Sequence, residues 1–263
     1  MPRDIIIEQA GAVRRVVINR PEVRNACRAI TLSELDAALA DAFADPSVSV
    51  VELAGAGDTA FCAGADLKEM ATRTTAAAIV EAMGGWWRVL DTLRRAPKPV
   101  IAGVKGFAVG GGTEIVLHCH IVIAATSARF GLPEVRRGHM PGAGGTVFLP
   151  RRIGRAAAAY YLLTGNDILA EDALRLGLAA KVVPDAALGE EMRSLGEHIG
   201  TLAPAAVRGI VKVLSQSEDM NIEDSIALER AACAEIRGGN HFNEGIRAFV
   251  EKRPPAYEGE ADA

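Results

Sequence analysis

Residues 100–117 have the sequence VIAGVKGFAVGGGTEIVL, and this stretch decides the fold. Its first five residues are apolar and predict a buried strand. A turn then leads to Gly110, Gly111 and Gly112, and directly into a helix-like segment at 113–117. Glycines at a strand-to-helix junction let a ligand approach the backbone, and the free N–H groups of a helix start attract negative charge. The stretch therefore predicts a backbone site for a developing negative charge.

Two glutamates accompany this junction. Glu114 lies in the first turn of the predicted helix, where the helix dipole favours the ionised form that a general base requires. Glu134 stands on a separate segment after Pro133, followed by the glycine-rich turn 142–145. Two carboxyl groups on different segments can be held in different protonation states. The residues alone do not decide between such an acid/base pair and two solvated glutamates at helix starts.

The rest of the chain predicts an α/β core followed by a helical tail. Apolar or alternating runs predict strands at 5–7, 13–18, 48–54, 120–125 and 179–183, with an extended piece at 128–131. Helices are expected at 31–43, begun by a capping box over 31–34, at 74–95, at 145–161 with interruptions at Pro150 and Gly154, and at 170–177. Only helices are expected later, at 188–202, 204–216, 222–236 and 243–252. We therefore divide the chain into a core over residues 1–184 and a helical region over 185–263.

Composition narrows the class of protein. The chain has 263 residues, of which 49% are hydrophobic and 24% charged, as in ordinary globular proteins. It has no apolar run long enough for a membrane span and no signal peptide, and its four cysteines lack metal-type spacing. A cytoplasmic protein with free thiols is expected, with no membrane partner. The net charge of −4 disfavours binding to nucleic acid.

Three other sites are considered and set aside. Residues 55–60, GAGDTA, loosely match a dinucleotide fingerprint, but no regular strand-to-helix junction follows them. His118 and His120 share one face of an extended segment, but no further metal ligands lie nearby in the sequence, so no metal is expected. A serine peptidase is excluded because the chain has no Gly-x-Ser-x-Gly motif.

Several segments resemble the signatures of the crotonase (enoyl-CoA hydratase/isomerase) superfamily. They are residues 60–70 (AFCAGADLKEM), 98–114 (KPVIAGVKGFAVGGGTE) and 130–146 (FGLPEVRRGHMPGAGGT), with 19–26 (NRPEVRNA) and 249–253 (FVEKR) resembling the family's two ends. The resemblance covers nearly the whole chain in the expected order. It implies an α/β fold with a ββα spiral (superhelix) core and a C-terminal helical trimerisation region. It also implies an acyl-CoA substrate, no separate cofactor, and a homotrimer or a homohexamer made of two trimers.

The resemblance also implies a reaction, the reversible hydration of a 2-enoyl-CoA. The backbone N–H groups of Ala65 and Gly111 would form an oxyanion hole for the thioester carbonyl and its enolate. Glu114 would act as base on the water that attacks Cβ, and Glu134 would supply the proton at Cα. The N–H of Gly142 would help to place that water.

Substrate contacts follow from the same resemblance. They are implied for Arg24, Ala26, Ala63, Asp66 and Leu67 along the CoA path, largely through backbone groups, for Gly110 and Pro133 beside the reacting atoms, and for Lys252 on a CoA phosphate from a neighbouring subunit. The segment 71–87 is expected to shape the acyl pocket. Trp86, Trp87, Met70 and Met83 are candidate pocket residues, although plain core packing is the preferred interpretation for them.

Two departures and two alternatives remain. His120 stands where the family commonly has an aspartate, and Lys105 where it commonly has an asparagine. The alternatives to hydration are other enolate reactions on acyl-CoA (double-bond isomerisation, carnitinyl-type dehydration or hydrolysis) and a non-catalytic RNA-binding role. The presence of both glutamates favours hydration over the former, and the acidic net charge disfavours the latter.

Overall fold

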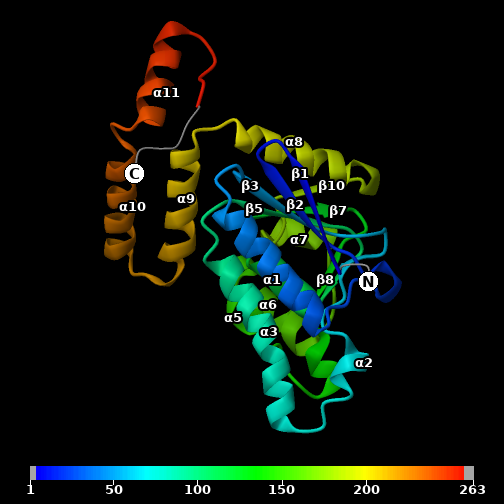
Figure 1. Cartoon of the computed structure of the whole chain (residues 1–263). Coiled ribbons are helices and arrows are strands. Elements are labelled where there is room, and N and C mark those ends of the chain that lie inside the picture. Colours follow the sequence, from blue (N-terminus) through cyan, green and yellow to red (C-terminus); the bar gives the residue numbers. More distant parts are fainter. Residues whose placement is uncertain (1–3, 258–263) are drawn as a thin grey trace.

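A computed structural model describes residues 4–257, and a six-stranded sheet organises it (Figure 1). The strand order is β1-β2-β3-β5-β7-β10. β1 (Ile5–Ala10) and β2 (Val13–Ile18) form an antiparallel hairpin, as predicted. The other strands continue in parallel from β2, namely β3 (Val50–Gly55), β5 (Val100–Val104), β7 (Ile121–Ala125) and β10 (Lys181–Val183).

A second, smaller sheet explains the spiral course of the chain. Its order is β4-β6-β8-β9, with strands β4 (Ala60–Cys62), β6 (Phe107–Val109), β8 (Arg129–Gly131) and β9 (Ile168–Leu169). Each long strand β3, β5 and β7 is followed by a short strand of the second sheet and then by helical structure. Three such ββα turns stack through parallel pairing in both sheets, so the predicted ββα spiral is confirmed.

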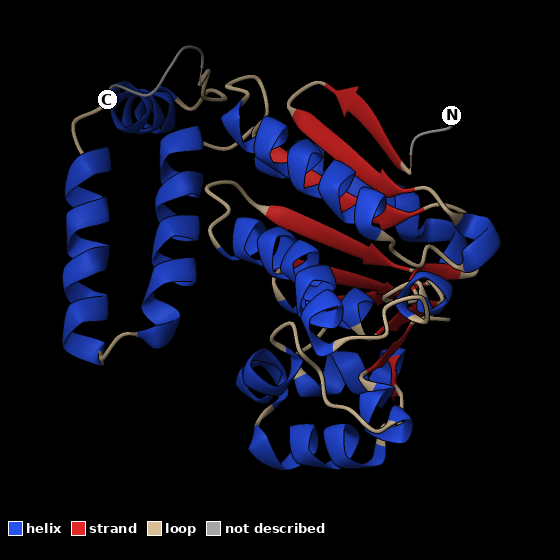
Figure 2. Ribbon diagram, turned by 60° about the horizontal axis from the view of Figure 1, so that its bottom comes forward, coloured by secondary structure: helices blue, strands red, loops and turns tan. Residues whose placement is uncertain are grey.

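The central strands of the main sheet are buried on both faces, whereas β1 at its edge is mostly exposed. α1 (Ala29–Ala44) and α3 (Ala76–Arg94) pack together on one side, where Leu35 and Leu39 meet Leu53 and other core residues. α8 (Leu188–Gly200) covers the opposite side with Leu188 and Met192 (Figure 2). Successive strand residues point to opposite faces, which is why β5 is apolar throughout rather than alternating, and why β3 departs from this only at Glu52, itself buried.

The C-terminal helices α9 (Pro204–Gln216), α10 (Ile222–Ile236) and α11 (Asn240–Glu251) project from this core (Figures 1 and 2). α9 and α10 pack on each other, and the tail leaves large apolar side chains exposed, among them Ile210, Leu214 and Phe249. α8 lies beyond the expected boundary at residue 184 but packs on the main sheet, and the division of the chain there stays a prediction. Among residues 4–257, no helix is both long and apolar enough to cross a membrane.

The remaining elements are short. They are η1 (Pro21–Val23), α2 (Leu67–Met70), η2 (Pro133–Arg137), α5 (Gly145–Ile153), α6 (Arg155–Thr164), α7 (Ala170–Leu176), η3 (Asp185–Ala187) and η4 (Ser217–Asp219). Pro150 does not interrupt α5 as expected. The break falls at Gly154 alone, whose φ of +79° ends the helix.

The predicted capping box of α1 is wrong. The helix begins at Ala29, two residues before Thr31, and Thr31 Oγ1 accepts a bond from Arg28 N–H while donating to Asp4. Glu34 accepts instead from the amides of Asp4 and Ile5. Glu34 therefore binds the N-terminal strand instead of the helix start, while Thr31 keeps a capping bond from a position further into the helix than the local pattern predicted.

Gly106 is predicted to tolerate no side chain. Its φ is +61°, and an added Cβ would lie 1.9 Å from the carbonyl oxygen of Thr59. Gly11 has a similar φ of +54° but open space around it, so Gly11→Ala is a matched control. Left-handed strain costs about 1–2 kcal/mol, and forced overpacking about 1–3 kcal/mol more. In urea unfolding, Gly106→Ala should therefore lose clearly more free energy of unfolding than Gly11→Ala. Equal losses would contradict the packing argument.

Candidate active site

A cavity of about 500 Å³ lies between α3, α4 (Gly111–Leu117), η2 and the loop after β4. The structure brings many of the predicted site residues to its wall. They are Ala63, Ala65, Leu67, Gly110, Gly111, Glu114, Pro133, Glu134 and Gly142. The residues come from all three ββα turns, so the spiral is what gathers them.

Two backbone segments meet at this cavity without intervening side chains. A Cβ on Gly64 would lie 2.7 Å from the carbonyl oxygen of Val109 and 3.3 Å from the amide nitrogen of Gly111. A Cβ on Gly112 would lie 2.1 Å from the carbonyl oxygen of Cys62. Real Cβ atoms do not approach so closely, so only glycine permits this contact.

The contact leaves two amides free at one place. Gly111 is the first residue of α4, so its N–H has no acceptor within the helix. Within the described part of the chain, neither the Gly111 N–H nor the Ala65 N–H donates a hydrogen bond. Both residues line the cavity. A carbonyl oxygen placed there can accept from two amides and from the positive end of the α4 dipole.

Glu114 is almost completely buried on α4. Its Oε1 accepts from the amides of Ala143 (2.8 Å) and Gly145 (2.9 Å), in the predicted glycine-rich turn. Burial raises the pKa of Glu114 to about 7, the two amide bonds oppose that rise, and the charge of Glu134 adds to it. The group can therefore exchange a proton near neutral pH, as a general base requires.

Glu134 is buried on η2 and faces the same cavity. A Cβ on Gly110 would lie 3.0 Å from its Oε1, which places it beside the α4 start. Its Oε2 is buried and has no hydrogen-bond partner within residues 4–257. Burial raises its pKa, while its own backbone amide and the charges of His139 and Arg137 act in the opposite direction. A buried carboxyl oxygen without a partner is available to bind a ligand or transfer a proton.

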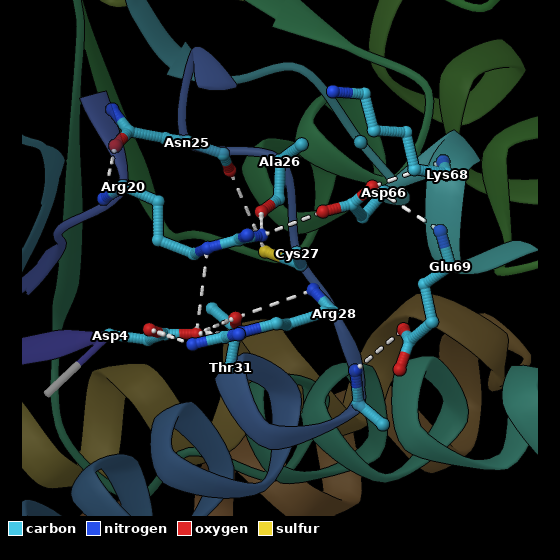
Figure 3. Close-up of polar contacts among 12 residues, drawn as sticks. Asp4, Arg20, Asn25, Ala26, Cys27, Arg28, Thr31, Asp66, Lys68 and Glu69 are labelled. Carbon is cyan, nitrogen blue, oxygen red and sulfur yellow. Dashed lines mark hydrogen bonds and ion pairs between the residues drawn. The ribbon is translucent and has the colours of Figure 1, made fainter. Parts of the chain in front are cut away.

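Arg20 connects the loop formed by residues 24–28 to the loop after β4 through hydrogen bonds (Figure 3). Its Nη1 donates to the carbonyl of Ala26 (2.5 Å) and to Asp66 Oδ2 (3.1 Å). The loops are also paired directly, because Cys27 N–H donates to the carbonyl of Gly64 at 2.8 Å. The side chain of Asp66 also caps α2, and its backbone N–H donates to the carbonyl of Cys27 (2.9 Å). Its carbonyl accepts from the amide of Met70 (2.9 Å), so only the second lone pair of that oxygen remains for the expected CoA contact.

The other expected CoA contacts lie outside the cavity wall. Arg24 has a left-handed backbone with φ of +55°, and its guanidinium lies 5.6 Å from the ring centre of Phe107. Ala26 presents its carbonyl to Arg20. Lys252 ends α11, with φ of +52°, and does not line the cavity of its own chain.

The apolar wall is formed mainly by α3. Met70, Ile79, Met83, Trp86 and Trp87 all line the cavity. The preferred interpretation as core residues holds for Trp86, and Met83 packs against the core, whereas Trp87 is half exposed and is not a core residue. Trp86 is also buried against the core, and Trp87 donates from Nε1 to the carbonyl of Gly142 at 2.9 Å. The expectation that residues 71–87 shape the acyl pocket agrees with this placement.

Five further cavity residues were not predicted, namely Gly64 and Val109 at the backbone contact and three residues that follow Glu134. Arg137, His139 and Met140 line the wall next to Glu134. The available signal was their position in the third motif, where Arg137 follows Glu134 by three residues. A 3₁₀-helix has three residues per turn, so such a pair shares one face, but the sequence pattern alone did not establish a 3₁₀-helix.

The departures from the family pattern are structural. His120 Nδ1 accepts from the amide of Val100 (3.1 Å), and Nε2 lies 3.2 Å from Oγ of Ser215 on α9. Burial lowers the pKa of His120 to about 4, so the ring is neutral at pH 7. Lys105 Nζ pairs with Asp58 at 2.5 Å. In the described part of the chain, no cluster of three or more His, Cys, Asp or Glu side chains is arranged to hold a metal ion.

Comparison with known proteins agrees with this geometry. A family model described as enoyl-CoA hydratase/isomerase matches residues 8–260. The chain belongs to the enoyl-CoA hydratase/isomerase family.

Relatives within the enoyl-CoA hydratase/isomerase family match over nearly their full length. The chain is 37% identical to (E)-benzylidenesuccinyl-CoA hydratase of Thauera aromatica, covering 97% of this chain and 99% of that protein. It is 38% identical to short-chain-enoyl-CoA hydratase of Clostridium acetobutylicum, with 95% of each chain covered. The crystal structure of an enoyl-CoA hydratase from Bacillus anthracis superposes with a TM-score of 0.95 at 36% identity, covering 98% of this chain and 100% of that one.

Glu114→Gln should change how stability depends on pH. The folded carboxyl has a pKa of about 7, against the usual 4.5 of a glutamate in water, so the folded state binds more protons than the unfolded state between these pH values. The free energy of unfolding therefore falls as pH rises through this window, by up to about 3 kcal/mol from this group. Gln can still accept both amide bonds but does not titrate. The measurement is urea unfolding of both proteins at pH 5 and pH 8. The free energy of unfolding of Glu114→Gln, relative to that of wild type, should be higher at pH 8 than at pH 5. A difference that does not change with pH would contradict the assignment.

Proposed function

We propose that this protein is an enoyl-CoA hydratase that adds water reversibly across the 2,3 double bond of a 2-enoyl-CoA thioester. The observation that carries the proposal is the meeting of Glu114 and Glu134 in one cavity with the free amides of Ala65 and Gly111. Relatives and solved structures named as hydratases support it. No separate cofactor is needed, because the thioester itself stabilises the intermediate as an enolate.

The two amides are proposed to bind the thioester carbonyl. As water adds to Cβ, electron density moves onto the carbonyl oxygen, and the amides of Ala65 and Gly111 stabilise that oxyanion. One such donor typically contributes about 2.7–4 kcal/mol to lowering the barrier. The amides are held by backbone contacts, so no side chain has to reorganise during the reaction.

The glutamates are proposed to move the two protons of addition. Glu114 takes a proton from the water whose oxygen bonds to Cβ, and Glu134 delivers a proton to Cα of the enolate. The amide of Gly142 helps to place the water between them. In dehydration the roles reverse. The pair suits this exchange because burial raises the pKa of both groups.

We propose that the CoA moiety follows the loops that Arg20 joins, along Ala63, Leu67 and the backbone of Asp66, near Arg24 and Ala26. Lys252 of a neighbouring subunit would then reach a CoA phosphate in a homotrimer, or in a hexamer of two trimers. Exposed apolar side chains on α9–α11, such as Ile210 and Phe249, support an interface there. The free state of all four cysteines supports a cytoplasmic location.

Turnover tests the proposal directly. Purified protein should abolish the absorbance of the conjugated thioester of a 2-enoyl-CoA, and Glu134→Gln should lower kcat by at least ~10²-fold because it cannot supply the proton. Glu52→Gln is a matched control. Glu52 is also a buried glutamate with a raised pKa, but it lies on β3 outside the cavity. No turnover with acyl chains of any length would overturn the proposal.

The pH dependence tests the role of Glu114. A base with a pKa of about 7 loses its charge below that value, so kcat/KM should fall toward tenfold per pH unit in the acid range. The measurement is a pH profile of kcat/KM for the wild-type enzyme and Glu114→Gln. A wild-type profile that stays flat down to pH 5 would contradict the assignment of Glu114 as the base.

A further inference from the structure

We propose that the acyl group of the substrate carries a second carboxylate, and that Arg137 binds it with His139 beside it. This inference rests on the proposed function, since it names the class of substrate for the same cavity. It follows from a cation that the hydration chemistry does not use.

Arg137 shares the face of η2 that carries Glu134. The two residues are three apart, and a 3₁₀-helix places such residues one above the other. Both line the cavity. The neighbouring Arg136 points elsewhere, because its guanidinium donates to the carbonyl of Thr164 (3.1 Å) and to Asn166 Oδ1 (2.7 Å) on and after α6.

Arg137 has no partner inside the protein. Among residues 4–257 it makes no ion pair and no side-chain hydrogen bond, whereas Arg20, Arg28 and Arg253 are each held by carboxylates. Glu134 is near enough to feel its charge but does not form a bond with it. The five donors of the guanidinium are therefore free for a ligand.

The surroundings indicate which ligand. The rest of the acyl wall is apolar, with Met70, Ile79, Met83, Trp86 and Met140. A guanidinium at the edge of such a wall favours a chain with an apolar body and an anionic end. A planar carboxylate accepts two parallel hydrogen bonds from arginine, so the pair is selective for the shape of the carboxylate as well as for its charge. His139 lies beside Arg137. Its Nδ1 donates to the carbonyl of Met140 (3.2 Å), so its Nε2, which makes no hydrogen bond in the described chain, can donate to a carboxylate only when the ring is protonated.

The position of Arg137 in the chain distinguishes the proposed carboxylate site from the proposed CoA contacts. Arg137 comes from the segment that carries Glu134, while the proposed CoA contacts come from residues 24–28 and 63–67. If Arg137 instead met a CoA phosphate, it would contribute equally to binding of every CoA thioester and of CoA itself. This difference is measurable.

Binding of unreactive saturated thioesters tests the inference without turnover. Adipyl-CoA and hexanoyl-CoA have the same chain length, and only the former carries the second carboxylate. Calorimetric titration of wild type should show tighter binding of adipyl-CoA. In Arg137→Met, its Kd should rise roughly 10- to 100-fold, while the Kd values of hexanoyl-CoA and CoA stay within about threefold.

Arg88→Met is the matched control. Arg88 is exposed on α3, makes no ion pair in the described chain and does not line the cavity, so its loss removes the same charge elsewhere. Arg137→Lys keeps the positive charge but loses the paired donors of the guanidinium, so it should retain part of the preference for adipyl-CoA over hexanoyl-CoA. Equal losses for all three ligands in Arg137→Met, or an unchanged adipyl-to-hexanoyl ratio, would overturn the inference.

Turnover separates this inference from the proposed function. The kcat/KM values for hex-2-enedioyl-CoA and hex-2-enoyl-CoA are compared in wild type and Arg137→Met. Their ratio cancels any effect of Arg137 on Glu134, which acts on both substrates, and it should fall by a factor similar to the loss in binding. If no 2-enoyl-CoA of any chain length is hydrated, these two included, the hydratase proposal fails, while the binding titrations still decide whether Arg137 selects a carboxylate.

Discussion

The close contact between two backbone segments, the loop after β4 and the first turn of α4, determines the geometry of the cavity. Gly64 lies over the carbonyl of Val109, and Gly112 lies over the carbonyl of Cys62, at distances that leave no room for a Cβ. The contact positions two amides without using them, because neither Ala65 nor Gly111 donates a hydrogen bond in the described chain. A backbone site of this kind loses little entropy on binding and needs no rearrangement during a reaction.

Burial then decides what the carboxyl groups can do. Glu114 and Glu134 are removed from water by the same elements, and desolvation is the largest influence on the pKa of each. Their partners differ, however. Glu114 is held by two amides of the turn 142–145, while Glu134 has an unbonded oxygen and lies near Arg137 and His139. One carboxyl group is therefore fixed and the other open, although both are glutamates in one cavity.

The cavity wall has two parts, one of backbone amides and carboxyl groups and one of apolar side chains. The apolar part comes largely from α3, which is long, packs on α1, and presents Met83 and Trp86 toward the start of α4. Trp86 belongs both to the hydrophobic core and to the cavity wall. Its ring is buried, and it occupies the space that a side chain on Gly111 would need. Arg137 differs from the other residues of the apolar part of this wall, because it is charged and has no ion pair within residues 4–257.

Local sequence determined the parts of this protein that depend on backbone chemistry. The run from Val100 to Gly112 predicted a buried strand, a turn and a glycine-rich helix start, because apolar periodicity and glycine act over a few residues. The motifs likewise placed Glu114 and Glu134 on separate segments. Only the tertiary structure decided which residues far apart in the chain form hydrogen bonds with each other. Glu34 binds the amide of Asp4 instead of capping α1, and Thr31 shares its hydroxyl between Asp4 and the N-cap amide of Arg28. His120 joins a strand to Ser215 of α9. Arg137 reached the acyl wall because η2 is a 3₁₀-helix with Glu134 already facing inward. Such outcomes depend on burial and on contacts between residues far apart in the chain, which no local pattern contains.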